Sequence, residues 1–156
     1  MSAMIAAVAS RARQRADWAE HAREELRRAG HRSGGARTAV LDQIARQDCC
    51  VTAQEIFDSL RAEGRDAGMA SVYRALDLLT RLGLVHRVEV ADAAGYEPAL
   101  PSGVHHHHVV CERCGKVSSF EDEGLERAID RVAGRLEFDV DAHDVVLRGA
   151  CEDCRK

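Results

Sequence analysis

Two pairs of cysteines carry the clearest chemistry in the sequence. Cys111 and Cys114 form one CxxC pair, Cys151 and Cys154 form a second, and 36 residues separate the two pairs. Zinc prefers four ligands in a tetrahedron, and each CxxC turn offers two thiolates on one side. A closed shell of four thiolates leaves no position for water, so the pattern predicts a structural Zn²⁺ site and not a catalytic one. A redox function is the alternative interpretation of either pair.

Four consecutive histidines, His105 to His108, end three residues before the first CxxC pair. Because alternate side chains of a strand point to opposite faces, His105 and His107 should face one way, and His106 and His108 the other. A single strand carrying these residues could therefore supply two separate metal sites.

Each histidine pair needs further ligands. For His105 and His107 the candidates are Glu126, on a predicted helix, and His143, on a predicted final hairpin. We call these four residues the inner set. Taken alone, Glu126 is equally consistent with an exposed acid, and His143 with an ordinary polar histidine.

For His106 and His108 the candidate partners are His86 and Glu97, which precede the histidine run and belong to a predicted β-hairpin. We call these four residues the hinge set. A site built across a hinge would couple metal occupancy to the arrangement of the two halves, which is what a metal sensor requires. The adjacent residues Cys49-Cys50 are a further option as thiolate ligands, although cysteines of this kind are most often buried apolar residues.

A candidate DNA-reading segment opens the helix predicted for residues 70–82. Ser71, Tyr73 and Arg74 would project outwards while Val72 points inwards. The first residues of a recognition helix meet the base edges of the major groove, where arginine pairs with guanine or phosphate. Arg37 and the arginines of the first helix would reach phosphates. An ordinary exposed helix face is the alternative interpretation of this segment.

The pattern of apolar residues and turn signals places these side chains on particular elements. The predicted helices cover residues 11–29, 36–47, 53–64, 70–82 and 125–136, and the predicted strands cover residues 85–90, 95–97, 105–111, 116–120, 138–140 and 143–147. Three helices followed by a hairpin is the order of a winged helix. The sequence thus predicts an α+β protein, with a winged helix-turn-helix domain in residues 1–100, of which 1–19 are an extension, and a small α/β domain in residues 101–156 that a metal would stabilise.

Charge is distributed unevenly along the chain. Residues 1–37 contain eight arginines and four acids, whereas residues 101–156 contain eight basic and twelve acidic residues. A basic start suits a polyanion such as DNA, although a solvated helix face would have the same composition. Because the sequence has no run of 18 apolar residues and no convincing signal peptide, we expect a cytoplasmic protein with no membrane contact, whose cysteines stay reduced.

The runs SVYRALDLLTRLGLV, VHHHHVVCERCGKV and CEDC, in this order, resemble the ferric uptake regulator superfamily of bacterial metal-responsive repressors. The resemblance covers roughly residues 20–154. It implies a homodimer with a C-terminal dimerisation domain, which binds double-stranded operator DNA when its sensor site is loaded. It assigns the four cysteines to the family's structural zinc site, and Tyr73 and Arg74 to the helix that contacts DNA.

The resemblance also extends to the two histidine sets. The inner set matches a metal site within the dimerisation domain. In the hinge set, the two histidines match ligands of the sensor site, and Glu97 matches its carboxylate in iron-type members. His86 stands where zinc-type members have an aspartate ligand.

Three departures from the family pattern bear on the metal that is sensed. Ser119 occupies a position where iron and peroxide sensors have an acid, and Cys49-Cys50 replace a usual histidine. The cysteine of zinc-type members is absent from the region of Ala99 and Leu100. Losing an oxygen ligand while gaining thiols and imidazoles favours a softer ion, so we expect a Zn²⁺ sensor, with Fe²⁺ or peroxide sensing as the alternative.

Two other classes of protein remain to be weighed. An enzyme with zinc-activated water would need an open coordination position and a base, and the sequence contains no HExxH motif. We therefore do not expect an enzyme. A zinc-binding buffer protein would share the metal sites but lack DNA binding, so the residues at the start of helix 70–82 distinguish it from a repressor.

Overall fold

The computed structural model describes residues 2–32, 35–47, 49–90, 93–100 and 106–155. The chain divides into two compact units, Met1–Val104 and His105–Lys156. The residue predicted to open the second domain, 101, lies outside the described residues, as does His105 of the inner set.

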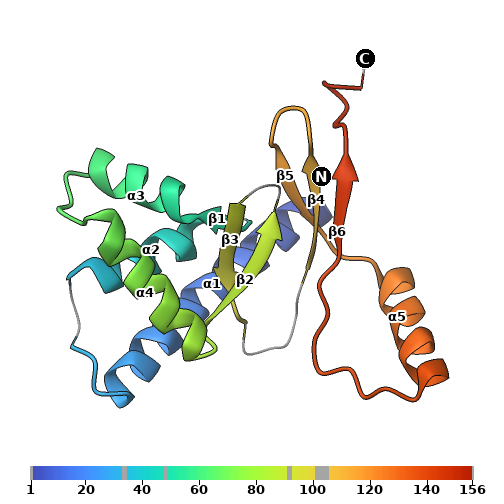
Figure 1. The fold of residues 1–156 in the computed structure, drawn as a ribbon, viewed down its shortest axis with the longest axis horizontal. Helices are drawn as coiled ribbons and strands as arrows, with labels where there is room; N and C mark the ends of the chain where they lie inside the picture. Colours follow the sequence, from blue (N-terminus) through green and yellow to red (C-terminus); the bar gives the residue numbers. More distant parts are fainter. Residues whose placement is uncertain (1, 33–34, 48, 91–92, 101–105, 156) are drawn as a thin grey trace. The chain divides into compact units, whose positions relative to one another are not determined.

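The described part of the first unit contains helices and strands in the order shown in Figure 1. They are α1 (Ser2–Arg28), α2 (Gly35–Arg46), β1 (Val51–Thr52), α3 (Ala53–Ala62), α4 (Met69–Arg81), β2 (Val85–Val90) and β3 (Ala93–Pro98).

Helix α1 begins at Ser2, nine residues before the predicted start at residue 11. The reason lies in the apolar opening segment, whose many alanines favour helix strongly. The indole of Trp18 is fully buried, and its Nε1 donates a hydrogen bond to the carbonyl oxygen of Leu84 at 2.8 Å. Arg23 pairs with Asp42 of α2 at 2.6 Å. Helix α1 is thus tied both to α2 and to the chain just before β2.

Helices α3 and α4 form the helix-turn-helix, and local signals explain their starts. The predicted capping box is confirmed: the amide of Glu55 donates to the Thr52 hydroxyl, and the Thr52 amide donates to the Glu55 carboxylate. Gly68 caps α4 without a side-chain hydrogen bond. The inward positions predicted for α4, among them Val72 and Leu76, are buried in the core.

A three-stranded sheet in the order β1-β3-β2 completes the winged helix. Strands β2 and β3 are the predicted hairpin, with His86 opposite Glu97 and Arg87 opposite Tyr96. Strand β1 was not predicted, because two residues are too short for a recognisable alternation; it pairs antiparallel with β3. This pairing attaches the wing to the start of α3.

The second unit contains a sheet and one helix in its described residues. They are β4 (His107–Cys111), β5 (Val117–Phe120), α5 (Glu123–Leu136) and β6 (Val146–Gly149), with strand order β5-β4-β6. The sheet is mixed, since β5 runs antiparallel and β6 parallel to the central strand β4.

The predicted final hairpin is wrong. Among the described residues, 138–140 form no strand, and β6 starts at Val146 and pairs with β4 instead of with a neighbour in sequence. Two observations account for this. Glu137 ends α5 in the left-handed conformation (φ 56°), and Phe138 is 71% exposed, so its apolar side chain marks a surface and not the buried face of a strand.

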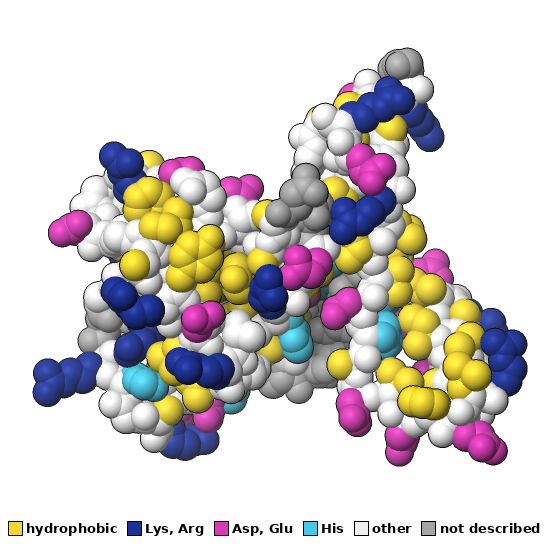
Figure 2. Space-filling model, in the orientation of Figure 1, with side chains coloured by type: hydrophobic (Ala, Val, Ile, Leu, Met, Phe, Trp, Pro, Cys, Tyr) yellow, Lys and Arg dark blue, Asp and Glu magenta, His cyan; other side chains and the backbone are white. Residues whose placement is uncertain are grey.

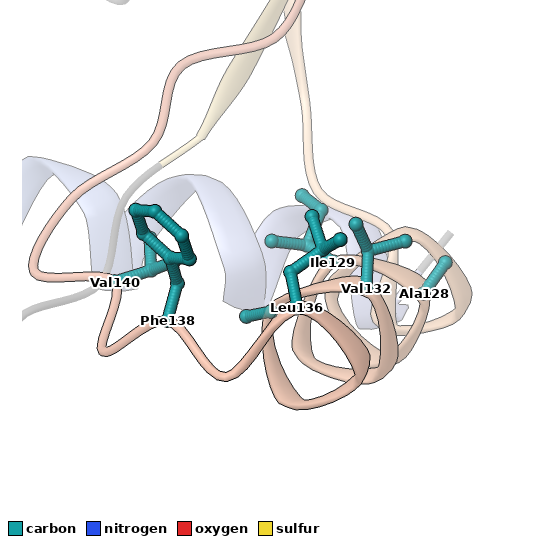
Figure 3. Close-up of a pocket in the computed structure, with 7 residues that line it drawn as sticks. Ala128, Ile129, Val132, Leu136, Phe138 and Val140 are labelled. Atoms are coloured by element: carbon teal, nitrogen blue, oxygen red, sulfur yellow. The ribbon is translucent and has the colours of Figure 1, made fainter.

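Few side chains of the second unit are buried. Among its described residues these are His107, His108, Val110 and Cys111. Helix α5 is amphipathic yet has no buried residue, and it leaves Ile129, Val132 and Leu136 along one side of a surface groove (Figure 3). The unit therefore lacks an extensive apolar core of its own. No helix in the described segments is both long and apolar enough to span a bilayer.

Candidate metal centres and nucleic-acid interface

The two CxxC pairs are brought together by the central and parallel strands of the second unit. Cys111 ends β4, and Cys151 follows β6, which lies beside β4. The Glu112 amide donates to the Gly149 carbonyl oxygen at 2.8 Å, which fixes the two turns side by side. Gly115 has a φ of 75°, a left-handed conformation that lets its amide donate back to the Cys111 carbonyl.

The sulfurs of all four cysteines lie within 4.8 Å of one another. The Sγ atoms of Cys114 and Cys151 are 3.8 Å apart. A tetrahedron of thiolates at about 2.3 Å from zinc has edges of roughly 3.8 Å, so the donor set and its spacing fit Zn²⁺. Bound there, the ion would cross-link β4 to the C-terminal segment.

Neighbouring groups shift the pKa values of two thiols in this cluster in opposite directions. Hydrogen bonds from the amides of Cys151, 3.3 Å away, and Cys114 lower the pKa of Cys111 to about 6. The side chains of Cys151 and then Cys114 raise the pKa of Cys154 to about 12. The thiolate form of Cys111 is thus stabilised by backbone amides, whereas the neighbouring sulfurs disfavour deprotonation of Cys154. A divalent cation bound among the sulfurs would favour deprotonation of all four thiols, as zinc binding requires.

A second cluster contains the described members of the inner set. Nε2 of His107 lies 2.7 Å from Glu126 Oε1, and Nε2 of His143 lies 3.1 Å from Glu126 Oε2. The two imidazole rings are 5.3 Å apart between centroids. One carboxylate therefore joins two imidazoles that approach from β4 and from the segment before β6, and the three groups offer ligand atoms within 4.8 Å of one another.

The start of α5 positions Glu126. Asp122 caps this helix, with its Oδ1 accepting a hydrogen bond from the Leu125 amide at 2.8 Å. The Glu126 amide donates to the Asp122 carbonyl oxygen, which places the Glu126 side chain in the first turn, facing β4. Asp122 was not singled out from the sequence, although an aspartate three residues before Leu125 is a recognisable cap.

The hinge set draws on both units. His106 and His108 belong to the second unit, and their rings lie 5.2 Å apart in an edge-on arrangement, as expected for one side of a strand. Glu97 belongs to β3 of the first unit and is 5% exposed. His86, opposite Glu97 on β2, is exposed and forms part of no cluster of three ligand atoms among the described residues.

Ser119 lies directly opposite His108 on the neighbouring strand β5. Residues opposite each other in an antiparallel pair have side chains on the same face of the sheet. The position at which the family resemblance leads one to expect an acid is thus beside a hinge-set histidine, and it carries a hydroxyl.

The candidate DNA-reading residues lie on the outer face of α4. Tyr73 is 50% exposed and Arg74 is exposed, whereas Val72 between Ser71 and Tyr73 is fully buried. Arg74 Nη2 donates to the Ser71 hydroxyl at 3.0 Å. Arg37, on α2, is half-buried. The start of α4 therefore offers a guanidinium, a phenol and a hydroxyl on one surface.

One further residue near this surface was missed from the sequence. Burial raises the pKa of Tyr96, the positive charge of Arg87 opposes that shift, and Tyr73 and Asp77 of α4 add to it. Tyr96 of β3 therefore lies near α4, and the exposed Arg87 of β2 lies directly opposite Tyr96 in the sheet. The sequence alone did not reveal the position of Arg87, because its pairing with Tyr96 depends on the register of β2 and β3.

Comparison with known proteins identifies the family. The model of the ferric uptake regulator family matches residues 28–148. The ferric uptake regulation protein of Bordetella parapertussis is 32% identical over 133 residues, which are 85% of this chain and 95% of that protein. The chain belongs to the ferric uptake regulator family of metal-responsive transcriptional regulators.

Solved structures support the fold. The ferric uptake regulator of Helicobacter pylori has a TM-score of 0.78 at 24% identity, and the alignment covers 91% of this chain and 94% of that one. The ferric uptake regulator of Vibrio cholerae has a TM-score of 0.71 at 28% identity, with 82% and 98% covered. The predicted fold class is confirmed: an N-terminal winged helix-turn-helix domain followed by a small α/β dimerisation domain.

Proposed function

We propose that this protein is a metal-dependent transcriptional repressor that binds double-stranded operator DNA as a homodimer. The observation that carries the DNA-binding part is the start of α4. There the side chains of Tyr73 and Arg74 are exposed, while Val72 and Leu76 of the same helix are fully buried in the core. Arg37 and Ser71 would add phosphate contacts, which fix the register on DNA, and Arg74 would contact a base edge.

We assign three metal roles. The four cysteines hold a structural Zn²⁺. The inner set holds a second ion between β4, α5 and the segment before β6. Glu97, His106 and His108 of the hinge set form the sensor site, whereas His86, which belongs to no cluster of ligand atoms among the described residues, is left out. Because the three ligands come from both units, loading of the site would favour one arrangement of the DNA-binding and dimerisation domains. A ligand shifts such an equilibrium only by binding one arrangement more tightly.

We propose Zn²⁺ as the sensed ion. The support is Ser119, which lies opposite His108 where an acid would add an oxygen anion. Imidazole ligands suit zinc and iron alike, whereas carboxylates favour harder ions. Fe²⁺ is the second candidate, since Glu97 is a buried carboxylate and the Bordetella parapertussis relative is named for ferric uptake.

The small size and exposed apolar surface of the second unit support the proposed homodimer. Leu136, Phe138 and Val140 line an open apolar groove beside α5, and Leu136 is 58% exposed (Figure 3). Figure 2 shows hydrophobic side chains gathered on the surface in the region of α5. A two-fold dimer would bury this surface and present two α4 helices to half-sites about 34–36 Å apart.

Operator binding under each metal tests the proposal. Protein freed of loosely held metal, but retaining its tightly held zinc, is titrated with Zn²⁺ or with Fe²⁺ under anaerobic conditions while anisotropy of labelled operator DNA is measured. Tight binding that needs added Zn²⁺ supports a zinc sensor, and a requirement for Fe²⁺ instead selects the iron alternative. Affinity that is the same with and without metal contradicts a metal-dependent repressor.

Two variants separate repressor from buffer and test the dimer. The double variant Tyr73→Ala/Arg74→Ala should lose operator binding and keep its zinc, whereas a buffer protein would have no operator binding to lose. Phe138→Asp should produce monomers in sedimentation measurements, while Leu82→Asp, a matched change at an exposed leucine of the first unit, should not.

A further inference from the structure

The wing carries an exposed arginine that has no role in the function proposed above. Arg87 lies on β2, and its side chain is 55% exposed. Its Nη2 forms an ion pair at 2.8 Å with Oε1 of Glu89, which lies two residues further along the same strand. Residues two apart on a strand point to the same face of the sheet. This face of the hairpin therefore holds a guanidinium and a carboxylate at the protein surface.

The same face of the hairpin packs on the helices of the first unit. Tyr96 stands directly opposite Arg87 on β3, and residues in that relation have side chains on one face. Tyr96 is 6% exposed and, like Val85 of β2, belongs to the core cluster that contains Val72 and Leu76 of α4. Helix α4 also contacts β2 directly. The strand that carries Arg87 is thus a neighbour of the helix that carries the candidate DNA-reading residues.

The charges around the Tyr96 hydroxyl come from both of these elements. The positive charge of Arg87 lowers the pKa of Tyr96, whereas Tyr73 and Asp77 of α4 raise it. Tyr73 and Asp77 are four residues apart in a helix, so they lie on the same side of α4. Arg87 and the side of α4 that presents Tyr73 are therefore both within electrostatic reach of one hydroxyl group.

The dimensions of DNA indicate what Arg87 would meet. An α-helix with its side chains is about 10–12 Å across, and the major groove of B-DNA is about 12 Å wide. A helix that fills the groove brings the phosphates along the edges of the groove against the elements packed beside it. Strand β2 is such an element of this protein. A guanidinium on β2 would thus meet phosphate oxygens, which arginine binds well, and not a base edge.

We propose that Arg87 extends the DNA-binding surface from α4 onto the wing, where its guanidinium contacts the phosphate backbone at the edge of the groove that α4 enters. This inference rests on the proposed DNA-binding function and adds a second element to it. Without DNA, Glu89 is the partner of Arg87, and on binding a phosphate takes the place of Glu89. Glu89 therefore limits the affinity, because its carboxylate competes for Arg87 and repels the phosphate.

The salt dependence of DNA binding tests the phosphate contact. The full-length protein, loaded with Zn²⁺ or Fe²⁺, is titrated onto a duplex that the wild type selects from a random-sequence pool. Each phosphate contact contributes about 0.9 to the slope of log affinity against log salt, and a homodimer has two copies of Arg87, so Arg87→Gln should lower the slope by about 1.8. Between about 200 and 50 mM salt, its affinity should rise about twelvefold less than that of the wild type.

Two matched variants control for charge and for position. Arg87→Lys keeps a cation that binds phosphate and should retain the wild-type slope. Arg81→Gln removes an exposed arginine from the last turn of α4, away from the first turns that enter the groove, and should also retain it. Fluorescence of the buried Trp18 reports that the first unit of each variant is folded.

A double-mutant cycle tests the exchange of partners. Exposed ion pairs contribute about 0.2–1 kcal/mol, so Glu89→Gln should tighten DNA binding by about 1.5- to 5-fold when Arg87 is present. In the Arg87→Gln background the same change should give little or no gain, because no guanidinium is left to release.

Three results would overturn the proposal while the proposed repressor function stands: an unchanged slope in Arg87→Gln, an equal loss of slope in Arg81→Gln, or a gain from Glu89→Gln that does not depend on Arg87. If the metal-loaded wild type selects no duplex at all, the proposed function itself is contradicted, and the wing contact with it.

Discussion

Replacing Cys154 with serine should unfold the second unit and leave the first unit folded. A structural zinc ion contributes about 10–16 kcal/mol in small zinc-dependent peptides, which equals or exceeds the entire stability of a typical domain, about 5–15 kcal/mol. The second unit has little with which to replace it. Among its described residues, Val110 and Cys111 are the buried apolar side chains, and full burial of a valine contributes only about 1.5–3 kcal/mol.

The structure provides a separate reporter for each unit. Trp18 is the single tryptophan, is fully buried and lies in the first unit, so its fluorescence should not change in Cys154→Ser. The Glu112 amide, which bonds to Gly149 across the zinc turns, should lose its protection against hydrogen exchange. Metal analysis should show the loss of one tightly held zinc per chain.

Cys49→Ser is the matched control, since it makes the same chemical change in the first unit and should retain both zinc and exchange protection. The reasoning is refuted if Cys154→Ser keeps its tightly held zinc, or if it loses zinc while the Glu112 amide remains protected. The first result would show that three thiolates suffice, and the second that packing alone maintains the second unit.

Three further predictions concern packing, capping and the inner set. Leu76→Ala should destabilise the first unit by about 2–5 kcal/mol in urea unfolding, because the side chain is fully buried. Leu82→Ala, at a position that is 37% exposed, should cost clearly less, and equal effects would contradict the assigned core. Thr52→Ala should cost about 1 kcal/mol by removing the cap of α3, whereas Thr52→Ser should retain most of that stability. His143→Ala should remove one metal equivalent while leaving the four-cysteine zinc in place, since its imidazole lies 3.1 Å from Glu126; an unchanged metal content would exclude it as a ligand.

The sequence was most informative where structure is determined locally. The stripe that includes Val72 and Leu76, and the capping box of Thr52 and Glu55, depend on residues within two helical turns of each other. Both are present as predicted. Alternation along a strand also predicted His106 and His108 on one side; their ring centroids lie 5.2 Å apart, although β4 begins only at His107 and so does not include His106.

Pairings between distant segments could not be predicted in this way. Strand β6 was assigned to a hairpin because a hairpin is the simplest partner for a nearby apolar run, yet it pairs in parallel with β4, more than 30 residues earlier. The apolar residues Phe138 and Val140 misled the prediction, since they form part of an exposed surface. The position of Ser119 opposite His108 also depends on register, which the sequence alone does not determine.

The central claim is that metal at the hinge set controls DNA binding, and operator affinity of the wild type and of His106→Ala, each with and without Zn²⁺, tests it most directly. Coupling between two ligands typically amounts to about 1–3 kcal/mol, so we predict that Zn²⁺ tightens operator binding by the wild type about 5- to 150-fold. In His106→Ala this gain should be lost, while the fold and the four-cysteine zinc remain. Equal tightening in both proteins, or none in either, would contradict the account.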